Sequence, residues 1–383
     1  MRTVIVAEVF LWLSLGLLVY GQLGYPLVLS ALARLIGRKQ VRTIEPEPVA
    51  PPVSLIVAAY DEGEIIAAKV ADALALDYPR ERLEVIVASD GSADATVAEA
   101  RRAGADVVLD LPRGGKIRAQ DAAVARARGE LVAFSDANAR WEPDALRTLV
   151  GAFADPRVGY ACGQVRFVHD PNQTGTNQEG LYWRYEMALR SLESRLQSIT
   201  AGNGAIYATR RESYIEVDPI MGHDLSFPFN MVKRGWRAVY VPAARATERM
   251  VPSIEGEFAR KRRMMSHTWP IVLRGGLLSP RGYTPLYALM IASHRVLRYV
   301  APLLHLVALV LSALLAAGHP IYLLILVAQL VLLAAALLGG VVRWRPLLVA
   351  RYYVLSTASV AAGLWDWLRH GTPAGWEPAE GTR

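Results

Sequence analysis

The chain has 383 residues, 53% of them hydrophobic, and a formal net charge of +7. This length accommodates one large globular domain together with membrane helices. The single cysteine, Cys162, rules out an intramolecular disulfide and argues against a cysteine-based metal site. None of the recognised nucleic-acid-binding motifs accompanies the positive charge, so we expect membrane lipids and no nucleic acid among the partners.

The N-terminal segment is almost continuously apolar from residue 4 to about residue 32. A helix needs roughly 20 such residues to cross a bilayer. Basic residues follow at once: Arg34, Arg38, Lys39 and Arg42. Because positive charge favours the cytoplasmic side, we predict a transmembrane helix within residues 1–43 and a cytoplasmic domain after it. A cleaved signal peptide is the less favoured alternative, since the apolar run is longer than such peptides have.

A proline-rich linker, residues 44–52, opens the next region. Short apolar runs then alternate with segments of helical periodicity. The pattern predicts strands at residues 53–59, 83–89, 106–110 and 131–135, and helices at residues 64–76, 93–104 and 115–128. Such alternation is typical of a parallel sheet built from βαβ units. We therefore predict an α/β domain over residues 44–254.

The C-terminal part combines two kinds of predicted helix. Residues 257–273 and 284–293 mix basic, aromatic and apolar side chains, which favours amphipathic helices in the membrane interface within residues 255–295. Helices buried in the protein are an equal alternative. Three apolar segments then predict a membrane region over residues 296–383: 296–317, 320–341 and 346–368. With the N-terminal segment this makes about four transmembrane helices.

Acidic residues follow three of the predicted strands. Asp61 and Glu62 follow the first strand, Asp90 the second and Asp136 the fourth. The carboxyl ends of strands form the ligand crevice of an open α/β sheet, so we expect these side chains to converge. Asp136 and Asn138 stand two apart, which lets both approach one cation from extended backbone. Their oxygen atoms suit Mg²⁺ or Mn²⁺ bound together with substrate phosphates.

Two glycines and a lysine, Gly114, Gly115 and Lys116, precede a predicted helix. Their backbone amides and the ammonium group could meet a phosphate there. The complete phosphate-loop pattern and the Gly-x-Gly-x-x-Gly pattern are both missing from the sequence, which argues against a P-loop nucleotidase and a dinucleotide enzyme.

In this order, the motifs resemble glycosyltransferase family 2, the inverting sugar-nucleotide transferases with a Rossmann-like GT-A fold. The resemblance runs from about residue 53 to residue 269. It implies a nucleoside diphosphate sugar as donor, expected to be a UDP-sugar, and a divalent ion on Asp136 and Asn138. The donor contacts that it implies are Ala58, Tyr60, Glu62, Asp90, Lys116, Asp136 and Arg263. Arg263 belongs to a basic run, residues 260–263, that could instead anchor a helix to anionic lipid.

The resemblance also places a catalytic base and an acceptor site. Asp224 matches the family's base, which takes a proton from the acceptor hydroxyl, and His223 stands where the family has a preceding acid. The implied acceptor contacts are Gly202, Asn203, Gly204, His223 and Trp269. The family's processive synthases carry Gln-x-x-Arg-Trp near the interface, and only Trp269 of that motif is present here.

The expected function is therefore transfer of a sugar to a lipid-linked or polysaccharide acceptor at the cytoplasmic face of the inner membrane, by a multi-pass protein. A processive synthase that extrudes its product is the alternative of the same class. A non-catalytic sugar-nucleotide sensor or scaffold is the alternative of another class, and Asn138 and His223 are the residues that would fit it. A transporter is disfavoured by the large domain and the few helices.

Overall fold

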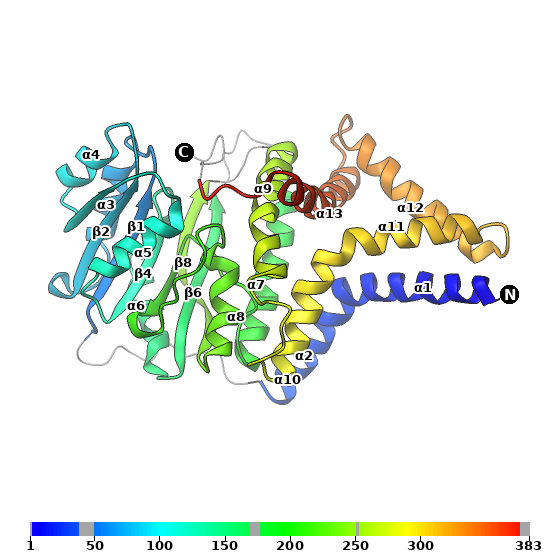
Figure 1. Cartoon of the computed structure of the whole chain (residues 1–383), viewed down its shortest axis with the longest axis horizontal. Helices are drawn as coiled ribbons and strands as arrows, with labels where there is room; N and C mark the ends of the chain where they lie inside the picture. The colour runs from blue at the N-terminus through cyan, green and yellow to red at the C-terminus, as the bar shows by residue number, and fades with distance from the viewer. Residues whose placement is uncertain (1, 38–49, 169–176, 250–252, 376–383) are drawn as a thin grey trace.

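The computed structural model describes residues 2–37, 50–168, 177–249 and 253–375. They form an α/β domain and an arm of long helices that projects from it (Figure 1). Three of the basic residues that follow the first apolar segment, Arg38, Lys39 and Arg42, and most of the proline-rich linker lie outside the described residues.

The domain is built on one eight-stranded sheet with the order β3-β2-β1-β4-β7-β6-β8-β5. Its strands are β1 (Val53–Ala59), β2 (Leu83–Asp90), β3 (Val107–Leu111), β4 (Leu131–Asp136), β5 (Arg140–Trp141), β6 (Val158–Val168), β7 (Tyr207–Arg210) and β8 (Arg237–Arg249). The first four are parallel, as the alternating pattern predicts. The other half, for which no strands are predicted from the sequence, is mixed: β7 runs antiparallel to both β4 and β6, β5 antiparallel to β8, and β6 parallel to β8.

The register of the parallel strands brings the predicted donor side chains to one edge. Ala58 of β1 pairs with Ala88 of β2 on one side and with Asp136 of β4 on the other. Asp90 is the last residue of β2. The acid-bearing strand ends therefore meet at the carboxyl edge of the sheet, as expected for an open α/β sheet.

Helices cover both faces of this sheet (Figure 1). They are α3 (Ile66–Leu74), α4 (Thr96–Arg102), α5 (Lys116–Arg126), α6 (Ala145–Val150), α7 (Asn177–Leu196) and α8 (His223–Lys233). Successive strand residues point to opposite faces. Leu55 accordingly joins the cluster formed with α3 and α6, whereas Ile56 joins the cluster formed with α5, α7 and α8. Both faces of the central strands are thus buried, which explains their continuous apolar sequences.

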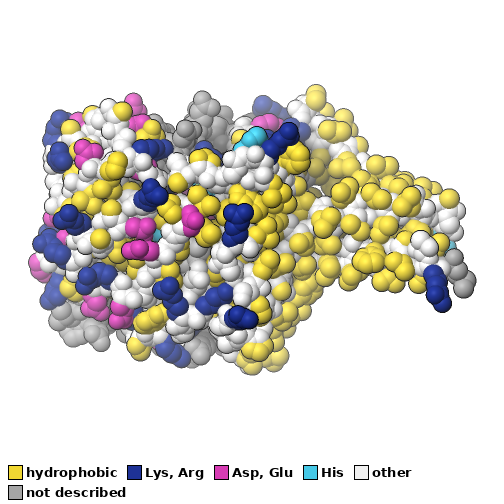
Figure 2. Space-filling model, viewed as in Figure 1, with side chains coloured by type: hydrophobic (Ala, Val, Ile, Leu, Met, Phe, Trp, Pro, Cys, Tyr) yellow, Lys and Arg dark blue, Asp and Glu magenta, His cyan; other side chains and the backbone are white. Residues whose placement is uncertain are grey.

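Four helical stretches are long and apolar enough to cross a membrane: Arg2–Leu35, Pro285–Leu315, Pro320–Leu338 and Arg345–His370. They contain the helices α1 (Arg2–Val19), α2 (Tyr25–Leu35), α10 (Pro285–Met290), α11 (Leu297–Leu315), α12 (Pro320–Leu338) and α13 (Arg345–His370). Figure 2 shows the side chains of the arm as an almost unbroken hydrophobic surface, in contrast with the charged surface of the domain. The prediction of four such helices is confirmed.

Two of these stretches change direction where the arm leaves the domain (Figure 1). Each contains a π-helical turn there, Tyr20–Gly24 in the first and Ile291–Val296 in the second, and such turns commonly kink a helix. The two turns touch through Tyr20 Oη and Ser293 Oγ, which lie 2.9 Å apart. Residues 284–293, predicted as a separate interface helix, are therefore the beginning of the stretch that becomes α11.

The helix α9 (Ile254–Leu273) stands between the domain and the arm and runs steeply across the direction of α1 and α11 (Figure 1). It packs along α13, where the Arg262 guanidinium binds the Asp366 carboxylate through two contacts of 2.6 Å. Trp269 Nε1 donates to Val360 O at 2.9 Å. An orientation across the arm fits the predicted helix in the membrane interface.

Candidate functional site

The carboxylate of Asp90 holds the glycine loop that precedes α5. Its oxygen atoms accept hydrogen bonds from Gly114 N at 2.7 Å and Gly115 N at 2.9 Å, and Arg113 Nη1 at 3.0 Å forms an ion pair with it. Gly115 has a φ of +98°, which favours glycine. The loop amides that could meet a phosphate are thus turned to Asp90 in this structure, and Asp90 couples the loop to the strand end.

The other predicted donor residues of the first strand surround the same corner. The Arg113 guanidinium lies 3.2 Å from the centre of the Tyr60 ring, and Glu62 is buried and begins the turn into α3. Ala58 is buried within the sheet. Of Ala58, Tyr60 and Glu62, Tyr60 is therefore the residue with an aromatic ring at this corner. The backbone of Ala58 lies next to that of Asp136.

Asp136 stands at the centre of the site. Its carboxylate pairs with the ammonium group of Lys116, the first residue of α5. Gly204 lies directly beside this pair, since a methyl group on Gly204 would lie 3.4 Å from Lys116 Nζ and 3.7 Å from Asp136 Oδ2. Asn138 follows in a turn after β4 and is half-buried. The expected extended backbone from Asp136 to Asn138 is therefore absent, because β4 ends at Asp136.

Two charged residues that the sequence reasoning missed lie next to Asp136. Lys69 of α3 is buried, and its Nζ donates hydrogen bonds to Ser135 Oγ at 2.7 Å and to Ala139 O at 2.5 Å. It therefore binds the residues on both sides of the Asp136–Asn138 turn. Burial lowers the pKa of Lys69 to about 8, although the charge of Asp136 opposes this. A signal existed, because Lys69 lies on the buried stripe of its helix with Ile66 and Ala73.

Glu248, near the end of β8, is the second missed residue. Burial, followed by the charge of Asp136, raises the pKa of the Glu248 carboxyl to about 7. Lys116, Lys69 and Arg260 act on it in the opposite sense. The sequence signal for Glu248 would have been an acidic residue near the end of a strand. This signal could not be used, because no strand is predicted from the sequence at residues 237–249.

Asp224 occupies the first turn of α8, a position where the helix dipole stabilises negative charge. Its main-chain oxygen accepts from Gly202 N at 2.6 Å, which joins the base segment to the glycine segment. Gly202 packs so closely on the Tyr160 hydroxyl that no side chain fits there. Asp136 and Asp224 both act on the buried phenol of Tyr207 and, after burial itself, raise its pKa. The segments predicted to bind the metal and to supply the base thus both act electrostatically on one tyrosine.

Two of the predicted acceptor contacts are core residues here. His223 is buried, stacks on Phe227 with ring centres 4.0 Å apart, and places Nδ1 2.8 Å from Tyr207 Oη. Burial lowers the pKa of His223 to about 3, so its ring is neutral. Asn203 is also buried, and its amide binds Gly163 O, Ala205 N and Ile206 N. Both residues shape the segments that carry Asp224 and Gly204.

The helix α9 brings its basic run and Trp269 to the membrane side of the site. Arg260 pairs with Glu257, whereas Arg263 is exposed. His267, one turn later, places Nδ1 3.1 Å from Ile220 O. Because a carbonyl oxygen only accepts, Nδ1 carries the proton. Arg263 and Asp224 both act on His267, so this face of α9 lies near the predicted base. Trp269 is packed among α9, α11 and α13.

The chain returns to this site after α13. Thr372 Oγ1 donates to Ser266 O of α9 at 2.8 Å. Ala374 then lies against Gly115 so closely that its carbonyl oxygen leaves no room for a side chain there. Residues 371–375 therefore form a strap from α13 to the glycine loop (Figure 1).

Comparison with known proteins places this architecture in context. The family model described as "Glycosyltransferase like family 2" matches residues 51–266, more than half of the chain. A mannosyltransferase from Pyrobaculum calidifontis, PcManGT, solved in complex with GDP-Man and Mn²⁺, has a similar fold with a TM-score of 0.70. It is 22% identical over 94% of this chain and 99% of its own.

Curated relatives are similar over the domain. An N-acetylglucosaminyltransferase from Rhizobium sp. is 27% identical over 55% of this chain and 51% of its own length. A beta-monoglucosyldiacylglycerol synthase from Synechocystis sp. is 31% identical over 41% of this chain and 33% of its own. A poly-beta-1,6-N-acetyl-D-glucosamine synthase from Staphylococcus aureus is 22% identical over 62% of this chain and 60% of its own. The chain thus spans from a third to somewhat over half the length of these relatives.

Proposed function

This chain belongs to glycosyltransferase family 2, and from that premise we propose that it is a membrane-bound inverting glycosyltransferase. It would move a sugar from a nucleoside diphosphate sugar to a lipid-linked or polysaccharide acceptor at the cytoplasmic face of the inner membrane. One observation carries the proposal. Contacts run without a break from Asp90 through Gly115, Lys116 and Asp136 to Gly204 at the carboxyl edge of the sheet, and Gly202 then binds the backbone of Asp224.

Each part of this edge has a role in the proposed reaction. Asp90, Tyr60 and the glycine loop would hold the nucleotide, and Lys116 and Arg263 the diphosphate. Asp224 would take the proton from the acceptor hydroxyl as that oxygen attacks the anomeric carbon, with the nucleoside diphosphate leaving from the opposite side. General-base catalysis of this kind contributes about 10²–10⁴-fold. His223 and Asn203 would act by holding the base and glycine segments in place.

The site also fits a divalent cation. After burial itself, the negative charge of Asp136 raises the pKa of the Glu248 carboxyl, and a bound dication would offset such repulsion between carboxylates. Among the described residues no three His, Cys, Asp or Glu side chains could hold a metal ion by themselves, so substrate phosphates would complete the ligand set, as Mg²⁺ commonly requires. Asp136 and Asn138 would hold Mg²⁺ or Mn²⁺, which when bound neutralises charge on the leaving diphosphate. The Mn²⁺ in the PcManGT complex supports this choice.

The identity of the substrates is inferred from the relatives. Several of them are N-acetylglucosaminyltransferases, which supports a UDP-sugar, whereas PcManGT was solved with a GDP-sugar. The membrane helices and the glucosyldiacylglycerol synthase favour a lipid acceptor. The poly-N-acetylglucosamine synthase keeps processive synthesis as a second candidate, although Gln-x-x-Arg-Trp is incomplete in this sequence.

The test is transfer from a panel of nucleotide sugars by the detergent-purified protein with Mg²⁺ or Mn²⁺ and native lipid extract. We expect one donor to release nucleoside diphosphate and to label lipid. Asp224→Asn should lower the rate by about 10²–10⁴-fold. Asp144→Asn, the same change at an exposed position before α6, should leave it unchanged. Label in long polymer would favour the processive synthase, and nucleotide binding without turnover of any donor would favour the sensor.

A further inference from the structure

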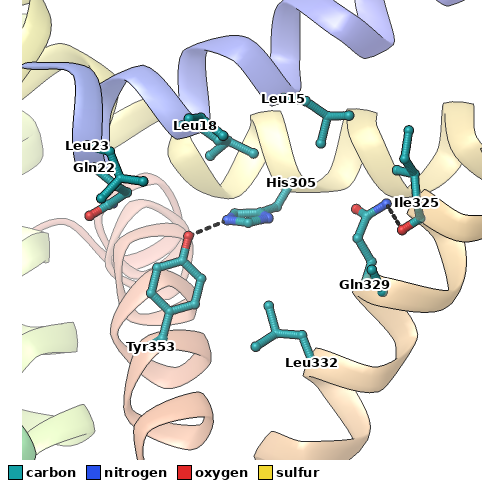
Figure 3. Close-up of a pocket in the computed structure, with 11 residues that line it drawn as sticks. Leu15, Leu18, Gln22, Leu23, His305, Ile325, Gln329, Leu332 and Tyr353 are labelled. Atoms are coloured by element: carbon teal, nitrogen blue, oxygen red, sulfur yellow. Dashed lines mark hydrogen bonds between the residues drawn. The ribbon is translucent and has the colours of Figure 1, made fainter.

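A pocket of about 430 Å³ opens within the helical arm (Figure 3). Its walls come from α1, the following π-helical turn, α11, α12 and α13. The lining includes Leu15, Leu18, Leu23, His305, Gln329 and Tyr353. Ligand pockets in proteins have volumes of about 300–1,000 Å³ and are mostly apolar with a few placed polar groups. This pocket has both properties.

The pocket is elongated along the membrane helices. On α1 and its continuation the lining residues run from Leu15 to Leu23, and eight helical residues span about 12 Å. All its walls belong to stretches long and apolar enough to cross a membrane. The hydrocarbon chains of the bilayer are therefore the material that surrounds it.

Polar side chains inside the pocket are the second observation. His305 Nε2 of α11 lies 2.7 Å from Tyr353 Oη of α13, and Figure 3 shows the two side chains meeting among the other lining residues. Polar residues within membrane segments are costly and usually mark a function. Gln329 differs, because its Nε2 donates to Ser312 Oγ of α11 at 3.1 Å and so ties α12 directly to α11, as interhelical polar contacts do.

We propose that this pocket binds a hydrocarbon chain of the lipid acceptor, with an oxygen of the lipid near the His305–Tyr353 pair. The proposal rests on the function proposed above and deepens it, because it states where the protein would bind the hydrocarbon chain of that same acceptor. The position of the pocket supports it. Tyr352, the neighbour of Tyr353 on α13, accepts from Lys261 of α9 at 2.7 Å, so the pocket adjoins the helix that borders the site.

The test fills the pocket with a side chain. Ala328 lines it from α12, and Ala328→Trp would occupy its volume. Leu330→Trp places the same indole on the outward face of α12, where Leu330 is 49% exposed, and is the matched control. Leu332→Trp fills the pocket one turn further along and serves if Ala328→Trp does not fold. The probe is a phospholipid with a diazirine on one acyl chain, in nanodiscs. Peptide mapping after illumination then locates the label.

We expect labelling of the lining peptides, and sugar transfer to native lipid extract, to fall at least five-fold in Ala328→Trp and to stay unchanged in Leu330→Trp. In the absence of lipid extract, all three variants should still release nucleoside diphosphate. Wild-type labelling and transfer in Ala328→Trp and Leu332→Trp would overturn the proposal and leave the proposed function standing. If labelling depends on the pocket but the protein transfers no sugar from any donor, the proposed function would be refuted, and only the binding of a hydrocarbon chain in the pocket would be supported.

Discussion

At the scale of single residues, the buried cation of Lys69 is the least expected feature of the site. It has no acidic hydrogen-bond partner among its described contacts, and it binds Ser135 Oγ and Ala139 O instead. A buried ammonium group is costly unless it is hydrogen-bonded. Because its two acceptors flank Asp136 and Asn138, we infer that Lys69 fixes the turn that presents these residues.

Replacing Lys69 by Met should therefore loosen the turn. Loss of the donor removes one hydrogen bond from Ser135 Oγ, which still donates to Asp136 O, and removes the lysine donor from Ala139 O. This lowers the free energy of unfolding by about 1–3 kcal/mol. The Mn²⁺ concentration for half-maximal turnover should rise several-fold. Metal titration of activity and thermal unfolding measure the two effects, and Arg101→Met on the exposed face of α4 is the control. An unchanged metal titration would mean that Asp136 is positioned without Lys69.

His223 should make the domain sensitive to acid. Burial holds its pKa at about 3 in the folded state, against 6.5 for the ordinary group. Below about pH 6.5 the unfolded chain therefore binds a proton that the folded chain does not. Stability should fall as pH drops, by about 2 kcal/mol between pH 6.5 and pH 5. In His223→Gln, thermal unfolding followed against pH should show a smaller loss over this window. Parallel curves for the two proteins would assign the acid sensitivity to other groups.

At this scale, sequence reasoning identified the side chains at the ends of the predicted strands. It missed the side chains that other elements, such as α3 and β8, bring to the site. Asp90 and Asp136 follow apolar runs directly, and local sequence was enough to place them. Glu248 comes near Asp136 because β8 pairs with β5, where Thr247 lies opposite Arg140, and this pairing joins residues far apart in the chain. His223 and Asn203 were identified by resemblance, which does not distinguish a side chain that touches a ligand from one that holds a segment.

At the scale of elements, the junction of domain and arm is held by a buried polar network. Glu193 of α7 accepts from Tyr25 Oη of α2 at 2.9 Å and from Thr200 N at 3.0 Å. Its Oε1 also lies 2.6 Å from His294 Nδ1 in the second π-helical turn. Arg295, also buried, donates to Thr200 Oγ1 at 2.8 Å. One carboxylate therefore joins the two stretches that bend at this level.

Removing that charge should weaken the junction. Glu193→Gln removes the buried carboxylate that binds His294 and acts on the nearby charge of Arg295, and breaking a buried ionic contact costs about 3–5 kcal/mol. The thermal midpoint of the detergent-purified protein should fall well below that of the wild type. Glu212→Gln, an exposed site after β7, should leave it unchanged. Equal midpoints for all three proteins would show that apolar packing alone holds α2 and α11 to α7.

The elements themselves were predictable where the signal was local. The strand at residues 53–59 coincides with β1, and the other three parallel strands differ by one residue at one or both ends, because continuous apolar runs bounded by turns mark buried strands. The π-helical turns Tyr20–Gly24 and Ile291–Val296 were missed, since local sequence periodicity does not distinguish a π-helical turn from the α-helix around it. The pairing of β6, β7 and β8 depends on contacts across the sheet, and local periodicity does not report those.

At the scale of the whole molecule, the helices that cross the membrane should fix on which side each connection lies. With the domain in the cytoplasm, the short connection between α11 and α12 would lie outside and the one between α12 and α13 inside. Cys162 is fully buried, so the native protein offers no background to thiol reagents that need an exposed cysteine.

Single cysteines at these connections should therefore report the topology. Ala317→Cys should react with a membrane-impermeant maleimide in intact cells. Val341→Cys, at a site that is 86% exposed, should react only after permeabilisation. Gel-shift labelling of the two variants and the wild type measures this. The reverse pattern would place the domain on the outer side of the membrane and remove it from cytoplasmic nucleotide sugars.

The strap formed by residues 371–375 also decides where the protein tolerates a fusion. Eight residues follow Gly375 in the sequence, so an affinity tag or fluorescent protein joined after Arg383 would be tethered close to Gly115 and Arg113. The N-terminus lies at the opposite end, at the tip of the arm (Figure 1). A C-terminal fusion is therefore expected to crowd the loop at Gly115, where we propose that the nucleotide binds, and a protease-cleavable junction would separate that crowding from the behaviour of the native chain.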